Sequence, residues 1–404
     1  YGSEWGNMHW GHAVSKDLVH WKEVGEALYP DEYGPVFSGS GVVDKKNTSG
    51  FGSKDKPAMV VSFTSSDDWI QGIAYSNDGR NFKRLDHPAV PKVTDGNRDP
   101  KVIWYEPEQK WVMVLWVEKE NRLNTMHFFS SKNLKDWELT STIEGGIGDD
   151  RYLFECPDLY ELPVQGMPGA KKWVITAANG EYAVGTFDGE AFHPEESRLT
   201  SVQTQDYYAA QTFTNDPQGR KIEIGWFRTK TNTASGNDFN QSMGIATELK
   251  LISTDEGIRL SRKPVEEFKK LRGKRYTFNN VELGQAAFPV EFEGEKPIEI
   301  QAEIDLQETE SITLDIKGVK VIYDAKNATL QVADEKATLK TDGKKLKLSM
   351  YVDRTGLEIF ANDGVFFMPV STLVNLENNK ISIMSKGKSK LVHLEVYELK
   401  SIWK

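Results

Sequence analysis

The phrase Ser131-Lys132-Asn133-Leu134-Lys135-Asp136-Trp137 recurs along the first half of the chain, and this recurrence decides the fold. Close copies occupy residues 15–21 (SKDLVHW) and 76–82 (SNDGRNF), and a weaker copy occupies residues 187–192 (FDGEAF). Asp, Asn and Gly tolerate the backbone angles of tight turns, so each copy alone predicts only a hairpin turn. The spacing adds a repeat, because the closing aromatic residues stand 61, 55 and 55 residues apart: Trp21, Phe82, Trp137 and Phe192.

Short runs of β-branched and aromatic residues lie between the copies, and each run predicts a strand. The clearest runs are 59–63, 111–116, 173–176 and 222–226. Four-stranded units that recur every 50 to 60 residues, with little helical periodicity, favour a β-propeller over a sandwich, whose strands do not recur as blocks. Four copies and a remainder predict five blades.

The pattern changes near Arg259. Residues 263–272 predict a short helix, with Pro264 in its first turn and apolar residues at 265, 268 and 271. Later runs such as 298–306, 312–316 and 346–350 alternate apolar and polar residues, which predicts half-buried antiparallel strands and hence a C-terminal β-sandwich. The all-β chain is therefore expected to divide into a propeller (1–257), a linker with a short helix (258–274) and a β-sandwich (275–404).

Composition excludes several classes of function. Fifty Lys and Arg against 60 Asp and Glu leave a net charge of -10, which argues against a nucleic-acid partner. No run approaches the roughly 18 apolar residues of a membrane span. The single cysteine, Cys156, cannot form an internal disulfide. The 11 Trp, 14 Tyr and 19 Phe suit stacking on sugar rings, although most aromatic residues of a β protein anchor its core.

Two carboxylates stand at equivalent places in successive blades. Asp99 and Glu155 each precede a predicted strand and are 56 residues apart, so they are expected to converge on the propeller centre. Arg98 is expected to keep Asp99 ionised, whereas the apolar neighbours Phe154 and Pro157 should raise the pKa of Glu155 and suit it to proton donation. One charged and one neutral carboxylate is the pair that glycoside hydrolysis needs. The alternative is a turn-closing ion pair and a rim carboxylate.

The order and spacing of many phrases, rather than any one of them, make the chain resemble glycoside hydrolase family 32, which contains invertases, levanases and inulinases. The matching phrases in the first 257 residues are 5–15, 17–21, 37–40, 98–102, 155–158, 206–212 and 224–226. Those in the last 130 residues are 352–355, 358–364 and 401–403.

The resemblance implies a five-bladed propeller followed by a β-sandwich, and retaining hydrolysis of terminal β-fructofuranosidic bonds. It implies that Glu155 is the general acid/base and that Asp99 stabilises the transition state. Cys156, next to Glu155, is expected either to tune the acid or to be a small buried residue. The resemblance also implies a set of substrate-binding positions, which are Trp5, Phe37, Ser38, Arg98 and Trp226. Neither a metal nor an organic cofactor is implied, and His9 and His12, three residues apart, lack a third ligand in the sequence.

One expected residue has no counterpart. The family carries its nucleophilic Asp in an N-terminal W-M-N-D-P-N-G phrase, which the 404 residues do not contain. Residues 215–219 (NDPQG) imitate it but are interpreted as a hairpin turn. We expect an incomplete first blade and a truncated chain of an active family, rather than a complete protein that evolved without its nucleophile.

Two other functions stay open at this point, a catalytically inactive fructan-binding protein and a related five-bladed hydrolase of arabinan. The expected partner is an oligo- or polysaccharide, with neither nucleic acid nor membrane, and a homo-oligomer is left open. A secreted or periplasmic location is expected, because polymeric fructans do not enter cells readily. Linkage preference and endo or exo action are not legible in the sequence.

Overall fold

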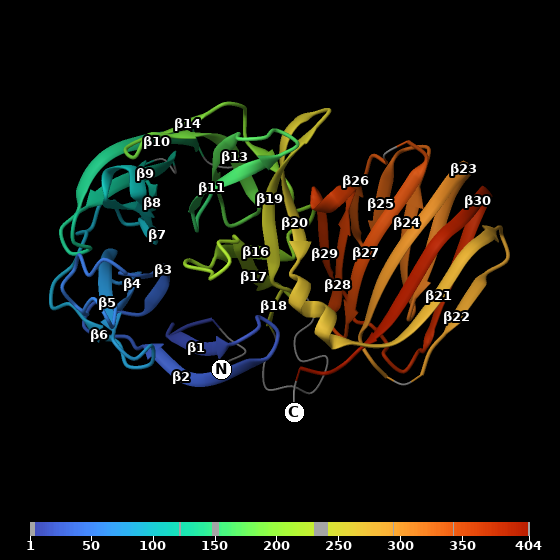
Figure 1. Ribbon diagram of the computed structural model, residues 1–404, viewed down its shortest axis with the longest axis horizontal. Coiled ribbons are helices and arrows are strands. Elements are labelled where there is room, and N and C mark those ends of the chain that lie inside the picture. The colour runs from blue at the N-terminus through green and yellow to red at the C-terminus, as the bar shows by residue number, and fades with distance from the viewer. Residues whose placement is uncertain are drawn as a thin grey trace.

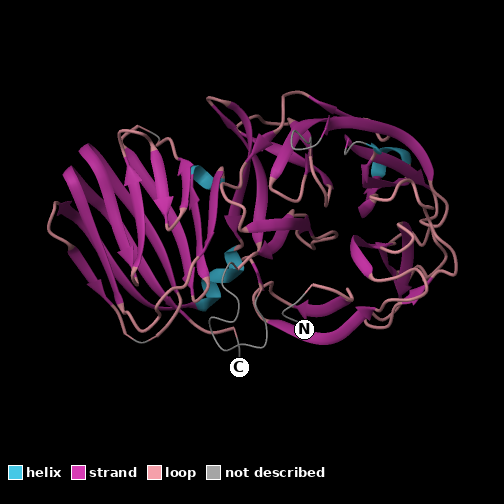
Figure 2. Ribbon diagram, turned by 180° about the vertical axis from the view of Figure 1, so that it is seen from behind, coloured by secondary structure: helices cyan, strands magenta, loops and turns pink. Residues whose placement is uncertain are grey.

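The computed structural model describes residues 5–120, 123–147, 153–229, 241–293, 295–341 and 343–402. A ring of small sheets lies beside a tall layered sheet, with a short helix between them (Figure 1). Strands make up nearly all of the regular structure, and helical segments are few and short (Figure 2). The predicted fold class, an all-β chain with a β-propeller followed by a β-sandwich, is confirmed. None of the helices in the described residues is long and apolar enough to cross a membrane.

The ring consists of antiparallel units in chain order. The first unit pairs only two described strands, β1 (Trp10–Ser15) and β2 (Trp21–Leu28). The second contains β3 (Val36–Val43), β4 (Met59–Ser65), β5 (Ile70–Ser76) and β6 (Lys83–Arg84). The third contains β7 (Arg98–Tyr105), β8 (Lys110–Glu118), β9 (Leu123–Ser131) and β10 (Glu138–Ile147). Strands β3 and β7 are edge strands of their sheets, and both lie on the inner side of the ring (Figure 1).

The fourth and fifth units join into one sheet. The fourth contains β11 (Asp158–Gln165), β12 (Lys171–Thr176), β13 (Glu181–Phe187), β14 (Phe192–Pro194) and β15 (Leu199–Thr200). The fifth contains β16 (Tyr207–Thr212), β17 (Ile222–Phe227), β18 (Ser242–Met243), β19 (Thr247–Thr254) and β20 (Gly257–Pro264). A short parallel pairing of β11 with β19 connects the two units. All four strand runs predicted between the repeated turns are confirmed.

The repeated phrase forms the same turn wherever it occurs. In the second unit, Asp78 Oδ1 accepts hydrogen bonds from the backbone N–H groups of Arg80 (2.9 Å) and Asn81 (2.8 Å). In the third unit, Asn133 Oδ1 accepts the equivalent bonds from Lys135 and Asp136 at 2.9 Å. Each turn leads from one strand of its unit into the outermost strand. Local side-chain bonds to the backbone therefore fix the repeat that the sequence displays.

The sandwich is built on two long strands. Its strands are β21 (Arg272–Leu283), β22 (Phe288–Glu291), β23 (Ile298–Ile316), β24 (Val319–Asp324), β25 (Thr329–Val332), β26 (Glu335–Thr338), β27 (Lys345–Asp353), β28 (Gly356–Ala361), β29 (Phe366–Ser371) and β30 (Lys380–Leu399). Strand β23 has 19 residues and pairs along its length with β30, which also pairs with β21 and β22. The sequence predicted two runs where β23 is one strand, because bulges near Gln307 interrupt the alternation.

The segment between the two bodies differs from the prediction in one respect. Residues 258–264, expected as linker, belong to β20, which pairs with β19 along its whole length. The predicted helix is a 3-10 helix over Glu266–Leu271. Its apolar positions 265, 268 and 271 are three residues apart, which suits the 3.0 residues per turn of this helix better than the 3.6 of an α-helix. The domain division at 257 and 275 stays a prediction.

Aromatic stacking joins the fifth propeller unit to the sandwich. Tyr207 of β16 packs its ring edge-on against Phe367 of β29, with ring centroids 5.1 Å apart. Phe367 in turn stacks on Phe360 of β28 at 4.7 Å. Polar contacts cross the same interface, because the Asp206 carboxylate accepts a hydrogen bond from the backbone N–H of Ser371 (2.8 Å). The sandwich thus packs directly against β16 and the residue that precedes it.

Candidate active site

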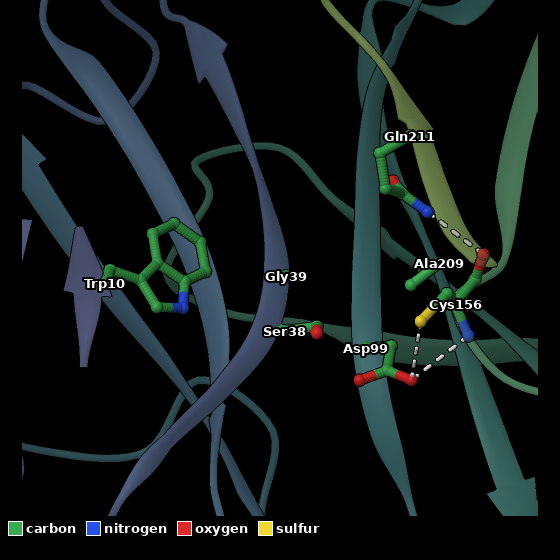
Figure 3. Close-up of a pocket in the computed structure, with 7 residues that line it drawn as sticks. All are labelled: Trp10, Ser38, Gly39, Asp99, Cys156, Ala209 and Gln211. Carbon is green, nitrogen blue, oxygen red and sulfur yellow. Dashed lines mark hydrogen bonds between the residues drawn. The ribbon is translucent and has the colours of Figure 1, made fainter. Parts of the chain in front are cut away.

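A cavity of about 230 Å³ opens at the centre of the ring (Figure 3). Residues from β1, β3, β7, the loop before β11, and β16 line it, so several units contribute to one pocket. They are Trp10, Ser38, Gly39, Asp99, Cys156, Ala209 and Gln211. The predicted convergence of the two carboxylate segments is confirmed, because Asp99 bonds to Cys156, and its neighbour Arg98 bonds to Glu155.

Asp99 is 6% exposed and points into the cavity from β7. Its Oδ2 accepts a hydrogen bond from the Cys156 backbone N–H (3.0 Å) and lies 3.4 Å from the Cys156 sulfur. Burial raises the pKa of Asp99 to about 6, against the lowering effects of the Arg98 charge and the Cys156 N–H. Arg98 therefore does not keep the Asp99 pKa at its ordinary value, because burial outweighs the neighbouring cation, but Asp99 is still mostly ionised at neutral pH.

Arg98 reaches Glu155 instead. Its Nε donates to Glu155 Oε1 at 3.1 Å, and its terminal nitrogen contacts the same oxygen. The hydroxyl of Tyr208 donates to the other carboxylate oxygen, Glu155 Oε2. The guanidinium also lies over the ring of Trp116, 4.1 Å from its centroid. Glu155 therefore has two polar partners that its sequence neighbours do not indicate, because a cation and a phenol hold the carboxylate between them.

The backbone around the two carboxylates lies in an uncommon region. Four non-glycine residues of the site have left-handed φ angles, which are 66° for Asp99, 57° for Glu155, 42° for Cys156 and 52° for Ala209. Such angles are rare outside glycine, and residues held in them cluster at active sites and ligand clamps. This group of left-handed residues supports the choice of the cavity as the candidate site.

The other predicted site residues fall into two groups. Ser38 lines the cavity, and Phe37 lies beside it on β3, with the 78% exposed Trp5 edge-on at 6.3 Å between centroids. Trp69 is edge-on to Phe37 at 6.1 Å between centroids. Trp5, Phe37 and Trp69 together form an aromatic rim. Trp226 is not among the lining residues. It lies behind Tyr208, with ring centroids 6.3 Å apart.

Sequence reasoning did not single out Trp10, Tyr208, Gln211 or Arg228. Gln211 Nε2 donates to the backbone carbonyls of Cys156 (3.0 Å) and Pro157 (3.1 Å), which fixes the loop that carries Glu155. The Arg228 guanidinium lies over the Tyr208 ring at 4.2 Å. Trp10, Tyr208 and Gln211 do lie inside phrases that carry the family resemblance. Their individual roles depend on contacts between units that no local pattern displays.

The NDPQG sequence at 215–219 forms the predicted hairpin turn between β16 and β17. Asp216 Oδ2 accepts hydrogen bonds from the backbone N–H groups of Gln218 (2.9 Å) and Arg220 (3.1 Å). Its carboxylate also pairs with the Arg220 side chain. Every oxygen of this carboxylate is committed to the turn, and none lines the cavity. Within the described ranges, no group of three His, Cys, Asp or Glu residues could hold a metal ion.

Gly39 sets how closely β3 packs against β4 at the cavity wall. A Cβ at this position would lie 1.9 Å from the Ser62 carbonyl oxygen and 2.8 Å from Phe63 Cα. We expect Gly39→Ala to lower the free energy of unfolding by about 1 to 3 kcal/mol through overpacking. Urea denaturation measures this effect. Gly11→Ala is the matched control, because a Cβ there meets no atom within 4 Å. Equal stability of the Gly39→Ala and parent proteins would contradict the prediction.

Comparison with protein-family models matches residues 1–264 to the glycosyl hydrolases family 32 N-terminal domain and residues 267–398 to the family 32 C-terminal domain. A levanase of Bacillus subtilis (strain 168) is 36% identical over 451 residues, covering 100% of this chain and 66% of the levanase. A levanase of Bacillus sp. (strain L7) is 30% identical, covering 98% of this chain and 49% of its own length. The chain thus spans between about half and two thirds of these levanases.

Solved structures show the same architecture. The exo-inulinase from Aspergillus awamori superposes with a TM-score of 0.85 at 25% identity, covering 99% of this chain and 92% of the inulinase. The fructofuranosidase from Schwanniomyces occidentalis, solved with fructose, superposes with a TM-score of 0.84 at 24% identity, over 99% of this chain and 91% of that one. The second likeness concerns the fold alone.

Proposed function

Because this chain belongs to glycosyl hydrolase family 32, we propose that its cavity binds a terminal fructosyl unit and that the protein hydrolyses β-fructofuranosidic bonds of fructans or sucrose. The observation that carries the proposal is the pair Asp99, which lines the cavity, and Glu155, which directly precedes the lining residue Cys156; hydrogen bonds fix each carboxylate. The relatives named levanase and exo-inulinase support the substrate class.

Glu155 is the proposed general acid/base. Protonated, it gives its proton to the leaving glycosidic oxygen, and as a carboxylate it then activates water. Arg98 and Tyr208 hold its two oxygens, which orients the group before the substrate arrives.

Asp99 is the proposed stabiliser of the transition state. Its carboxylate lies in the cavity, where it can accept hydrogen bonds from sugar hydroxyls as the ring gains oxocarbenium character. The pKa of about 6 means that this acceptor becomes fully ionised only above that pH in the empty protein. Retaining hydrolysis further needs a nucleophilic carboxylate. The family resemblance places that group in a phrase that residues 1–404 do not contain.

The experiment compares hydrolysis and binding on four substrates: levan, inulin, sucrose and arabinan. It uses the 404-residue chain and the protein as its natural source produces it. We expect the source protein to release fructose from at least one fructose-containing substrate. Binding of fructans without hydrolysis by the source protein would establish the inactive binding protein instead. Activity on arabinan alone would establish the arabinan hydrolase.

We further propose that the protein acts outside the cytoplasm on a saccharide partner. Two relatives are named extracellular exo-inulinases, one from Meyerozyma guilliermondii and one from Aspergillus awamori. Fructan polymers are too large to enter cells readily, so a hydrolase that acts on them has to meet them outside. Activity measured in cell-free culture fluid and in washed cells of the source organism tests this location.

A further inference from the structure

The segment Gln241–Ala246 lies between Trp226, which packs behind Tyr208, and the sandwich. Its first residue contacts the site, because Gln241 Oε1 accepts hydrogen bonds from Trp226 Nε1 (2.8 Å) and from the Thr229 backbone N–H (3.1 Å). The two residues of β18 then pair with β17, where Met243 lies opposite Trp226. The segment therefore holds the indole of Trp226 through the Gln241 side chain, and the backbone of Trp226 through strand pairing.

A carboxylate of the sandwich holds the other end of this segment. Glu358 lies on β28, and its two oxygens accept the backbone N–H of Ile245 at 3.0 and 3.3 Å. Gly244 permits the approach, since a Cβ there would lie 3.1 Å from Glu358 Oε2 and 2.9 Å from the Tyr207 ring. This hydrogen bond joins residues 113 positions apart in the chain.

Contacts continue from Trp226 to the reacting carboxylate. The Trp226 ring is edge-on to Tyr208, and the hydroxyl of Tyr208 donates to Glu155. The Arg228 guanidinium lies over both rings, 4.2 Å from the centroid of Tyr208 and 4.9 Å from that of Trp226. A displaced Trp226 would therefore change the packing of the side chain that orients Glu155.

We propose that Glu358 is a positioning residue, through which the sandwich domain holds the Gln241–Ala246 segment and thereby sets the position of Trp226 behind Tyr208, the side chain that orients Glu155. This rests on the proposed function for its effect on sugar binding, but the position of Trp226 is a property of the protein alone. The sandwich is then a working part of the site, although none of its residues lines the cavity.

The electrostatic surroundings of Glu358 agree with this role. The charged or titratable groups near it are Asp353 on the neighbouring strand β27, which disfavours its ionisation, Tyr351, which lies opposite it on the same strand, and Tyr207 of β16. Burial is the main cause that raises the pKa of Glu358, to about 8. Below that pH the group is a neutral acid, which a glutamine imitates in shape and in its ability to accept the Ile245 N–H.

The test compares four variants by ¹⁹F NMR of protein labelled with fluorotryptophan. A fifth variant, Trp226→Phe, assigns the Trp226 signal. We expect Glu358→Ala and Gln241→Ala to shift that signal, and Glu358→Gln to restore it at pH 6. The matched control is Asp363→Asn, which removes the exposed ion pair to Lys263 (3.0 Å) across the same interface and touches no cavity residue. An unchanged Trp226 signal in folded Glu358→Ala would overturn the proposal.

Sugar binding supplies the second readout, by calorimetry with a fructo-oligosaccharide. We expect Glu358→Ala to raise the dissociation constant about threefold to tenfold. Adding Glu358→Ala to Gln241→Ala should weaken binding little further, since both act through one segment. Fully additive losses would overturn the proposal. If the parent protein binds no fructose-containing sugar, the proposed function fails, while the NMR comparison still decides the role of Glu358. Should Glu358→Ala not fold, Glu358→Met replaces it, because methionine has a similar volume and offers no oxygen to accept the Ile245 N–H.

Discussion

Glu155→Gln should lower kcat for fructan hydrolysis by about 10² to 10⁴-fold in the active protein, and leave the dissociation constant for the sugar nearly unchanged. The amide has the shape of the carboxyl group and can still accept the Arg98 hydrogen bond seen at 3.1 Å. It carries no proton to donate to the leaving oxygen. Steady-state kinetics and calorimetry of the two proteins measure the two effects separately.

Two comparisons sharpen this prediction. Substrates with a better leaving group need less protonation, so they should lose less activity in Glu155→Gln than fructans do. Glu161→Gln is the matched control, because Glu161 lies six residues further along, pairs with Lys171 on the surface and does not line the cavity. If Glu155→Gln retains the parent kcat on fructans, Glu155 is not the general acid.

The second large effect concerns Glu358 and stability. Its pKa rises from 4.5 in the unfolded chain to about 8 in the folded protein, chiefly through burial. The folded state therefore holds a proton that the unfolded state has lost, and stability falls as pH rises from about 4.5 to 8 and levels off above. At about 1.4 kcal/mol per pKa unit, and with water screening part of the effect, we expect this loss to amount to about 2 to 4 kcal/mol between pH 5 and 8.

Glu358→Gln should remove this loss, because an amide does not titrate. Urea denaturation of both proteins at pH 5, 6, 7 and 8 measures the difference in slope. Asp99, whose pKa is also raised, contributes equally to both proteins and cancels. Asp363→Asn, which alters an exposed ion pair of the same interface, should keep the parent slope. Parallel pH profiles for Glu358→Gln and the parent would show that Glu358 is ionised in the folded protein.

The propeller was predictable because its repeat is local. The Asp78 and Asn133 side chains bond to backbone two and three residues away, so the turn is written in each copy. Asp99 and Glu155 are about one repeat apart, so the same repeat predicted that their segments meet. The partners of these carboxylates were not predictable. Successive strand residues point to opposite faces, and a bulge follows Arg98, so Arg98 turns away from its neighbour Asp99 towards a loop 57 residues distant.

The contact of Glu358 with Ile245 was not predictable from the sequence either, because Glu358 lies in the sandwich and Ile245 in the propeller. In addition, the donor is a backbone N–H, which no side-chain pattern displays. Hydrophobic alternation predicts which strand faces are buried, but not which backbone group an isolated carboxylate meets. The raised pKa of Asp99 also depends on burial by other units, which neighbouring residues in the sequence do not display.

The pairing of β30 with three strands has a consequence for the order of events during synthesis. Most propeller strands pair with strands adjacent in the chain, so these sheets can form as they emerge from the ribosome. The sandwich is different, because β21, β22 and β23 stay unpaired on one side until residues 380–399 arrive. The nascent chain thus carries exposed strand edges for about a hundred residues, until β30 closes the sheet.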